Sequence, residues 1–398
     1  MSNTKAICFE TTLGEISTFE KSYTFSRAIE GEGEVKHIHY GDIHTKLPNV
    51  INEANILPTI TQQDEFQFVN YGDIIIADAS EDYKDLGKAV CYLDQEEKKV
   101  ISGLHTHRLK VDKSKVVPEY LINLFQTSRY RKFVWKMGTG VSVLGLSKSN
   151  LSKYPVTLPN IETQRNIGFF FGRLNKKIQL QQEKINSLKE QKKGYMQKLF
   201  KQEIRFKDDD DAEYPKWRKK VKAAELFEAI SNKNSEEKIP VLSATQDQGM
   251  VLRDLLNKDM QYSTTNLNSY KIVDIDDFVI SLRSFQGGIE LSHLKGLVSP
   301  AYTIFRKKND NVYNDYFKYL FKTETFINQL KTATYGIRDG KSISYKDFST
   351  LKFDLPSYAE QRKIVGFLSK LDEKIQIEEQ QLDCLQEQKK GFMQQMFI

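Results

Sequence analysis

The chain has 398 residues, of which 39% are hydrophobic and 28% charged, a balance typical of a soluble protein with room for two medium-sized domains. No run approaches the roughly eighteen apolar residues of a membrane-spanning helix, and no N-terminal apolar run follows basic residues, so we expect a cytoplasmic protein with no membrane partner. Cys8, Cys91 and Cys384 are too scattered for a disulfide framework or a Cys-x-x-Cys zinc site. The net charge of +6 is compatible with polyanion binding but does not require it.

Residues 1–155 are predicted to form a first globular head. Short β-like runs, at residues 36–40 and 71–77, are separated by Gly, Asp and Asn turns, and Glu30-Gly31-Glu32-Gly33 is typical of a turn. Residues 118–137 are the clearest helix, because Pro118 suits a first helical turn and Gly138 stops the pattern. The mixture of short strands and a helix indicates an α+β head.

The end of this predicted helix mixes basic and aromatic side chains. Arg129, Arg131, Lys132 and Lys136 are interleaved with Tyr130, Phe133 and Trp135. Such a surface can hold phosphates and stack on bases, and the loop that follows offers Thr139 and Ser142. The end of an ordinary amphipathic helix produces the same string, so both interpretations stay open.

An internal repeat organises the chain. Residues 151–200 recur at residues 348–397 with no gap, and twenty of the fifty positions are identical. Each copy begins with Leu-Pro and continues as a long helix with a narrow apolar stripe on a Gln, Glu and Lys surface, which is typical of a coiled-coil seam. The seam residues are Ile167, Phe170, Leu174, Ile178, Ile185, Leu188, Ile364, Phe367, Leu371, Ile375, Leu382 and Leu385.

The order of elements predicts how the helices pair. The central helical region, residues 156–207, ends where the second head begins, and the C-terminal region, residues 353–398, starts where that head ends. The chain must therefore return along itself, which predicts an antiparallel coiled coil of about forty residues, or roughly 60 Å. We expect two mixed α/β heads separated by this spacer, with pseudo-twofold symmetry.

The second head, residues 208–352 with an acidic linker at 207–213, follows the plan of the first. Residues 273–280 correspond to 69–76, and residues 314–321 to 118–125. The loop with Arg338, Lys341 and Ser342 corresponds to the loop around Gly138, while Arg283, Ser284 and Gln286 follow a predicted strand. The spacer halves are alike and the heads are not, as expected if the spacer meets two identical partners and the heads read different targets.

The chain lacks a recognisable catalytic motif. Residues 336–342 resemble a phosphate-binding loop, but three residues separate the glycines where four are required. His37-x-His39 and His105-x-His107 have no acidic or cysteine ligand at a defined spacing, so no metal site is predicted. The chain also lacks an amino-methylation signature and a paired-carboxylate nuclease motif. We therefore predict no catalytic residues.

Almost the whole chain resembles the specificity subunit of a type I restriction-modification enzyme. The diagnostic string is a Leu-Pro, then a Gln-Arg or Gln-Lys, then a long helix that closes on Lys-Lys-Gly. It occurs here as Leu158-Pro159, Gln164-Arg165 and Lys192-Lys193-Gly194, and again as Leu355-Pro356, Gln361-Arg362 and Lys389-Lys390-Gly391. The first copy departs from the second at Thr163, where the second has Glu360.

The resemblance implies that the heads are target-recognition domains, each reading one half of an asymmetric double-stranded DNA sequence. It implies that the helices bind two methyltransferase subunits and, through them, restriction subunits. On this reading the chain binds no cofactor, and S-adenosylmethionine, ATP and Mg belong to the partners. Base contacts are then assigned to Thr139, Ser142, Arg283, Ser284, Gln286, Arg338, Lys341 and Ser342, and phosphate contacts to Arg129, Arg131, Lys132 and Lys136.

Two other classes of protein stay open. A stand-alone DNA methyltransferase or nuclease would need a site that the sequence does not reveal, and the missing cofactor motifs argue against it. A coiled-coil scaffold without DNA contact would not need two unlike heads. Which bases are read does not follow from the sequence, because groove contacts depend on side-chain geometry.

Overall fold

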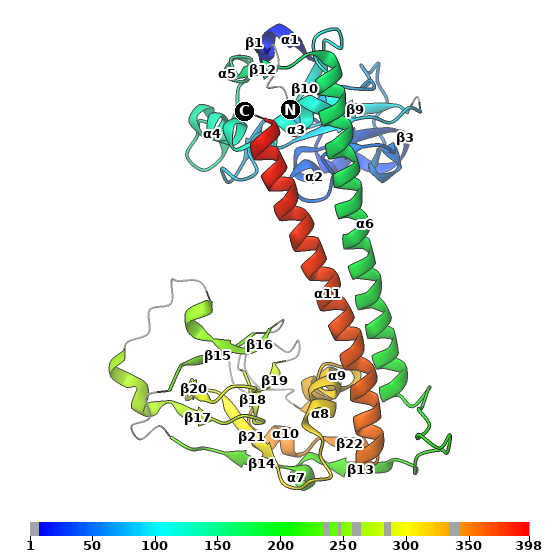
Figure 1. Ribbon diagram of the computed structural model, residues 1–398, viewed down its shortest axis with the longest axis vertical. Helices are drawn as coiled ribbons and strands as arrows, with labels where there is room; N and C mark the ends of the chain where they lie inside the picture. Colours follow the sequence, from blue (N-terminus) through cyan, green and yellow to red (C-terminus); the bar gives the residue numbers. More distant parts are fainter. Residues whose placement is uncertain are drawn as a thin grey trace, which may run out of the picture. The chain divides into compact units, whose positions relative to one another are not determined.

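The computed structural model describes residues 8–96, 98–233, 239–245, 248–256, 264–281, 288–333 and 343–397 (Figure 1). The chain divides into two compact units. The first unit is Met1–Gln182 with Gln380–Ile398, and the second is Glu183–Glu379. Each unit contains one head and a part of each long helix.

The first head is a mixed α/β domain. Its strands are β1 (Phe9–Thr12), β2 (Ser17–Glu20), β3 (Glu30–Ile38), β4 (Val50–Ile51), β5 (Thr59–Ile60), β6 (Ile74–Ala77), β7 (Ala79–Ser80), β8 (Ala89–Tyr92), β9 (Val100–Ser102), β10 (Thr106–Val111), β11 (Leu144–Gly145) and β12 (Pro155–Leu158). Its helices are α1 (Leu13–Ile16), α2 (Tyr40–Thr45), α3 (Pro118–Leu124), α4 (Ser128–Met137) and α5 (Lys148–Leu151), with 3-10 turns at Arg27–Ile29 and Ala54–Ile56. One sheet has the order β2-β10-β6-β8-β4, and another has the order β5-β3-β9.

Strand β6 lies in the middle of the larger sheet and is buried on both faces. Because successive strand residues point to opposite sides, Ile74 and Ile76 pack into the core that contains α3 and α4. Ile75 and Ala77 pack into a second core on the other face. This double burial explains the unbroken apolar run in the sequence.

The second head repeats this plan. Its strands are β13 (Arg218–Lys222), β14 (Phe227–Ile230), β15 (Leu242–Thr245), β16 (Gly249–Leu252), β17 (Lys271–Val273), β18 (Phe278–Ile280), β19 (Ile289–Leu291), β20 (Gly296–Val298), β21 (Thr303–Lys307) and β22 (Lys352–Leu355). Its helices are α7 (Ala223–Leu226), α8 (Asn314–Leu320), α9 (Glu324–Ala333) and α10 (Tyr345–Ser349), with 3-10 turns at Arg253–Leu255 and Thr264–Ser269. Its main sheet has the order β14-β21-β18-β19. Strand β13 pairs antiparallel with β22, as β1 pairs with β12 in the first head.

Each head contains an equivalent Arg–Asp ion pair, at the start of the central strand of its main sheet. In the first head, Arg108 Nε donates to Asp73 Oδ2 at 2.8 Å, and both side chains are buried. In the second head, Arg306 Nε donates to Asp277 Oδ1 at 2.5 Å, and Asp277 is fully buried. Each aspartate immediately precedes its strand, so the predicted correspondence between the two strand regions is confirmed.

Two long helices complete the units: α6 (Ile161–Phe200) and α11 (Tyr358–Met396). In the second unit, Lys184 pairs with Glu378 at 2.6 Å and Lys192 with Asp372 at 2.5 Å, so the partner's number falls as α6 advances. In the first unit, α6 and α11 also run side by side, and the rings of Phe170 and Phe392 lie 5.1 Å apart (Figure 1). The predicted antiparallel pairing is therefore confirmed.

The pairing covers the predicted seam unevenly. Ile185, Leu188, Ile364, Ile375, Leu382 and Leu385 are buried, whereas Ile167, Phe170, Leu174, Ile178, Phe367 and Leu371 are half-buried. A pair of helices encloses less of a stripe than a larger bundle does. Part of the apolar stripe therefore stays accessible to solvent.

Two local predictions for the first head are wrong. Residues 118–137 form two helices and not one, because the Thr127 side chain accepts the Tyr130 N–H and starts a new helix. Glu30-Gly31-Glu32-Gly33 is not a turn but the beginning of β3. The β-like run predicted at residues 36–40 is confirmed for residues 36–38, where β3 ends, whereas α2 begins at Tyr40. Among the described residues, no helix is long and apolar enough to cross a membrane.

Candidate nucleic-acid interface

Helix α4 has one face buried in the head and an opposite, solvent-exposed face that is basic. Tyr130 and Val134 are fully buried, and the Tyr130 hydroxyl donates to the Gly87 carbonyl at 3.0 Å. Lys132 and Lys136 lie on the exposed side and form no ion pair with any described residue. The helix therefore combines a fixed position with cations that are available to a partner.

Arg131 is occupied by the protein itself. Its guanidinium donates to the carbonyls of Leu86 at 2.7 Å and Tyr83 at 2.6 Å, and burial lowers its pKa from the ordinary value. The Trp135 indole N–H donates to the same Tyr83 carbonyl at 3.0 Å. Arg131 thus holds α4 against the loop before β8, which argues against a primary role in phosphate binding. Arg129, by contrast, is exposed and makes a long contact, 3.4 Å, with Thr157 Oγ1.

The loop after α4 is closed by backbone hydrogen bonds. The Thr139 N–H donates to the Gly145 carbonyl at 3.0 Å, and the Gly145 N–H donates to the Thr139 carbonyl at 2.7 Å. Gly140 has a left-handed φ of 136°, and a Cβ there would lie 2.0 Å from the Val143 carbonyl oxygen, so only glycine fits. The predicted base-contacting residues Thr139 and Ser142 are exposed on this loop.

The predicted contacts of the second head cannot be placed in the same way. Arg283, Ser284, Gln286, Arg338, Lys341 and Ser342 lie outside the described residues, as does the stretch at 336–342 that resembles a phosphate-binding loop. What the structure describes there is α9, which the Thr323 side chain caps as Thr127 caps α4. The helix–helix corner before the loop is therefore common to both heads.

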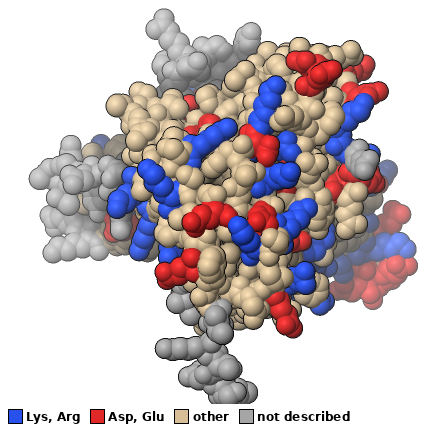
Figure 2. All heavy atoms as spheres, turned by 90° about the horizontal axis from the view of Figure 1, so that it is seen from above, with Lys and Arg blue, Asp and Glu red and all other residues tan. Residues whose placement is uncertain are grey.

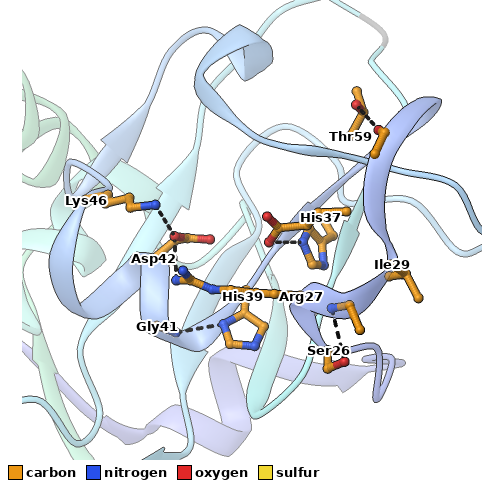
Figure 3. Close-up of polar contacts among 12 residues, drawn as sticks. Ser26, Arg27, Ile29, His37, His39, Gly41, Asp42, Lys46 and Thr59 are labelled. Carbon is orange, nitrogen blue, oxygen red and sulfur yellow. Dashed lines mark hydrogen bonds and ion pairs between the residues drawn. The ribbon is translucent and has the colours of Figure 1, made fainter.

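Histidines of the first head are engaged with different protein groups. His37 Nε2 lies 3.1 Å from a Glu30 carboxylate oxygen, and His39 Nδ1 accepts the Gly41 N–H at 3.1 Å (Figure 3). His105 and His107 both face Asp78, at 3.4 and 3.5 Å. Within the part of the chain that the structure describes, no group of three or more His, Cys, Asp or Glu residues is placed to hold a metal ion.

An open groove of about 830 Å³ lies in the second unit, between the long helices and the start of α9. Lysines of α6 line it, but they pair with acids: Lys192 with Asp372 at 2.5 Å and Lys193 with Glu324 at 3.3 Å. The Lys192 ammonium also lies 5.1 Å from the centre of the Tyr319 ring. Because these charges are satisfied within the unit, the groove does not have the character of a nucleotide site.

On the face shown in Figure 2, the described residues form no uniformly basic patch, because their Lys and Arg side chains lie among Asp and Glu side chains. The local sequence of α4 and its loop is therefore a better guide to the interface than the overall charge of +6.

Comparison with known proteins identifies the family. The sequence profile of the type I restriction modification DNA specificity domain matches residues 9–190 and 217–387, so it matches twice and covers most of the chain. The chain belongs to this family. As a specificity subunit of a type I restriction-modification system, it has a DNA-recognition role, and subunits of this kind are generally non-catalytic.

Individual relatives agree with this assignment. The specificity subunit is 24% identical over 364 residues to a protein of Methanocaldococcus jannaschii provisionally named the type I restriction enzyme MjaX specificity subunit, covering 86% of this chain and 82% of that protein. It shares its fold, with a TM-score of 0.57 and 14% identity, with the S subunit of a type I restriction-modification system from M. genitalium, covering 100% of this chain and 97% of the other. A structure from a study of complex assembly and conformational transition of the type I R-M system gives the same TM-score and identity, with 100% and 99% covered.

Some features of the specificity subunit's interface escaped sequence reasoning. Val141, in the loop after α4, is fully exposed, and its sequence position alone did not single it out. The closely spaced glycines of Gly138-Thr139-Gly140 could have signalled a tight loop that turns the next side chains outward. The carbonyl contacts of Arg131 had no such signal, because they involve residues more than forty positions earlier.

Proposed function

We propose that the chain reads a bipartite, asymmetric DNA sequence, one half with each head, and positions adenine methyltransferase subunits over that sequence. On this proposal it performs no bond chemistry and binds no cofactor. S-adenosylmethionine, ATP and Mg are held by its partners. The complex works in the cytoplasm, where the DNA is.

The observation that carries the proposal is a comparison of α4 with α9. The buried positions keep their character, because Tyr130 and Val134 in α4 correspond to Phe326 and Leu330 in α9, all at most 3% exposed. The exposed positions differ: Arg129, Lys132 and Lys136 correspond to Thr325, Asn328 and Thr332. Two heads with a common frame and unlike outer faces are what an asymmetric target requires.

In the first head, we propose that Arg129, Lys132 and Lys136 contact phosphates, because they are exposed cations on one helix. Thr139 and Ser142 are proposed to contact base edges, since a rigid loop can enter a groove. In the second head the same role is proposed for Arg283, Ser284, Gln286, Arg338, Lys341 and Ser342.

The long helices are the proposed docking surface for two methyltransferase subunits, which in turn hold the restriction subunits. Leu180 of α6 and Ile377 of α11 occupy equivalent positions in the repeat, and both are exposed, at 52% and 54%. An exposed aliphatic side chain at the same place in both copies suits two identical partners. Further helices packed here would also cover the half-buried part of the seam.

Mapping methylated adenines across the genome of cells that express this chain with its methyltransferase tests the proposal. We expect one motif made of two short, unlike sequences separated by an unread gap, with one methylated adenine in each. A continuous or palindromic motif would contradict two independently reading heads. Methylation by the purified chain without any partner would contradict the non-catalytic role.

A further inference from the structure

Two valines at the apex of the loop after α4 are exposed to solvent. Val141 is fully exposed, at 101% relative to an extended chain, and Val143 is 57% exposed, with the exposed Ser142 between them. An apolar side chain in water forgoes the stabilisation that burial gives. Exposure of this degree at a loop apex therefore suggests a side chain that a partner covers.

The loop holds these side chains in a defined place. Beside the two hydrogen bonds between Thr139 and Gly145, β11 pairs with β7, and Leu144 and Leu146 are buried immediately after the apex. The His107 ring Nε2 lies 2.7 Å from the Leu146 carbonyl oxygen and fixes the far side of the loop. Valine itself is stiff, because its branched Cβ leaves few rotamers. The loop apex therefore loses little conformational entropy when it binds a partner.

The charge of the segment that contains α4 and the loop favours a polyanion over a protein surface of mixed charge. Residues 128–150 contain five Lys or Arg residues and no Asp or Glu. Two of these cations, Lys132 and Lys136, lie on the exposed face of the helix that leads directly into the loop. An apolar loop tip next to exposed cations suits DNA, because the cations can pair with phosphates while the tip enters the groove between the phosphate backbones.

The major groove contains one apolar group for such a tip, the 5-methyl group of thymine. We propose that Val141 is a specificity-determining residue of the first head and that it recognises a thymine methyl group in the first half-site. This inference rests on the proposed function and deepens it. An adenine that is methylated must be paired with thymine, so each proposed half-site contains at least one such methyl group.

Thymine-to-uracil replacement tests the contact, because uracil lacks only the methyl group. The protein is the full chain with its methyltransferase, and the probes are duplexes of the mapped target with each thymine of the first half-site replaced in turn. We expect one replacement to weaken binding about three- to fivefold, the effect of one apolar carbon. In Val141→Ala the same replacement should have no effect, and this variant should bind the unsubstituted target as weakly as the wild type binds the uracil duplex.

Ile56→Ala is the matched control, since Ile56 is another exposed aliphatic residue of the first head, at 54%. It should keep the wild-type ratio of thymine to uracil binding. If Val141→Ala keeps the full ratio at every position, or if no replacement affects the wild type, the methyl contact is wrong while specific binding of the unsubstituted target still supports the proposed function. A wild-type complex that binds DNA without any sequence preference would instead contradict both the methyl contact and the proposed function.

Discussion

The side chain of Gln361 accepts the backbone N–H of Tyr313 at 2.9 Å. Tyr313 is the residue immediately before α8, and Gln361 lies in the first turn of α11. The amide nitrogen of Gln361 donates to the carbonyls of Asn311 at 2.9 Å and Pro356 at 3.1 Å. One fully buried side chain therefore joins the start of the long helix to the start of a head helix.

Gln164 makes the same arrangement in the first unit. Its Oε1 accepts the Val117 N–H at 2.9 Å, and its Nε2 donates to the Pro159 carbonyl at 2.8 Å and to the Lys115 carbonyl at 3.3 Å. The Gln-Arg string that marks both copies of the repeat thus has a structural reason. In each unit the glutamine accepts the backbone N–H just before α3 or α8, which has no partner within the helix, and donates to one carbonyl before that helix and one before the long helix.

Replacing Gln361 with alanine should leave a buried N–H and two carbonyls without their partner. We expect the free energy of unfolding of the second unit to fall by about 1–3 kcal/mol. Arg362→Ala, at the exposed neighbouring position, is the control and should change it by less than about 0.5 kcal/mol. The chain's two tryptophans, Trp135 and Trp217, lie in different units, so denaturant unfolding followed by fluorescence in a Trp135→Phe background reports the second unit alone. Equal midpoints for Gln361→Ala and Arg362→Ala would refute this role.

Glu360 stabilises only the second unit. Its Oε2 accepts from Arg205 at 2.8 Å and from the Trp217 indole N–H at 2.9 Å, and the first copy has Thr163 in its place. Glu360→Ala should lower the free energy of unfolding by about 2–4 kcal/mol, because it leaves the buried Trp217 indole N–H without a partner and removes the carboxylate beside the Arg205 guanidinium, which keeps only the carbonyls of Tyr214 and Pro215. Thr163→Ala should have little effect. Thermal unfolding followed by circular dichroism would compare them, and similar midpoints would show that the cluster contributes little.

The first unit should lose stability in mild acid. Burial is the largest cause that lowers the pKa of His39, His44 and His107 below the ordinary value of 6.5. The folded state keeps these rings neutral while the unfolded chain protonates, so the unfolded state binds more protons below about pH 6.5. The stabilisation is complete above that pH and is lost as the pH falls through the lowered folded values.

Fluorescence of Trp135 in a Trp217→Phe background would follow this loss between about pH 7.5 and 5.5. His44→Gln should reduce the dependence, because the ring is half-buried and the replacement does not titrate. The second unit contains one of the six histidines, His293, and serves as the internal comparison. An equal loss in both units over this range would exclude the histidines as the cause.

The long helices could be predicted because their signals are local. A repeat of fifty residues with a regular apolar stripe specifies helix length and pairing, and the order of elements gives the antiparallel direction. The corner at Thr127 also has a local signal, since threonine is a common helix N-cap. The apolar pattern without this signal predicts α3 and α4 as one helix.

Features that join distant segments could not be predicted in the same way. Strand β1 pairs with β12, and β13 with β22, across well over a hundred residues, and no local pattern specifies that register. The role of Arg131 likewise depends on where the carbonyls of Leu86 and Tyr83 lie after folding. For the candidate interface, the residue types were predictable, but the exposure of Val141 depends on the closed loop at Gly140.

The central claim is that each head reads its own half of the target. The most direct measurement is the methylated motif of a hybrid in which residues 213–352 are replaced by the second head of another specificity subunit. Because the heads have separate cores, we expect one half of the motif to change and the other half to stay the same. A hybrid that methylates DNA but has changed in both halves, or in neither, would contradict the claim.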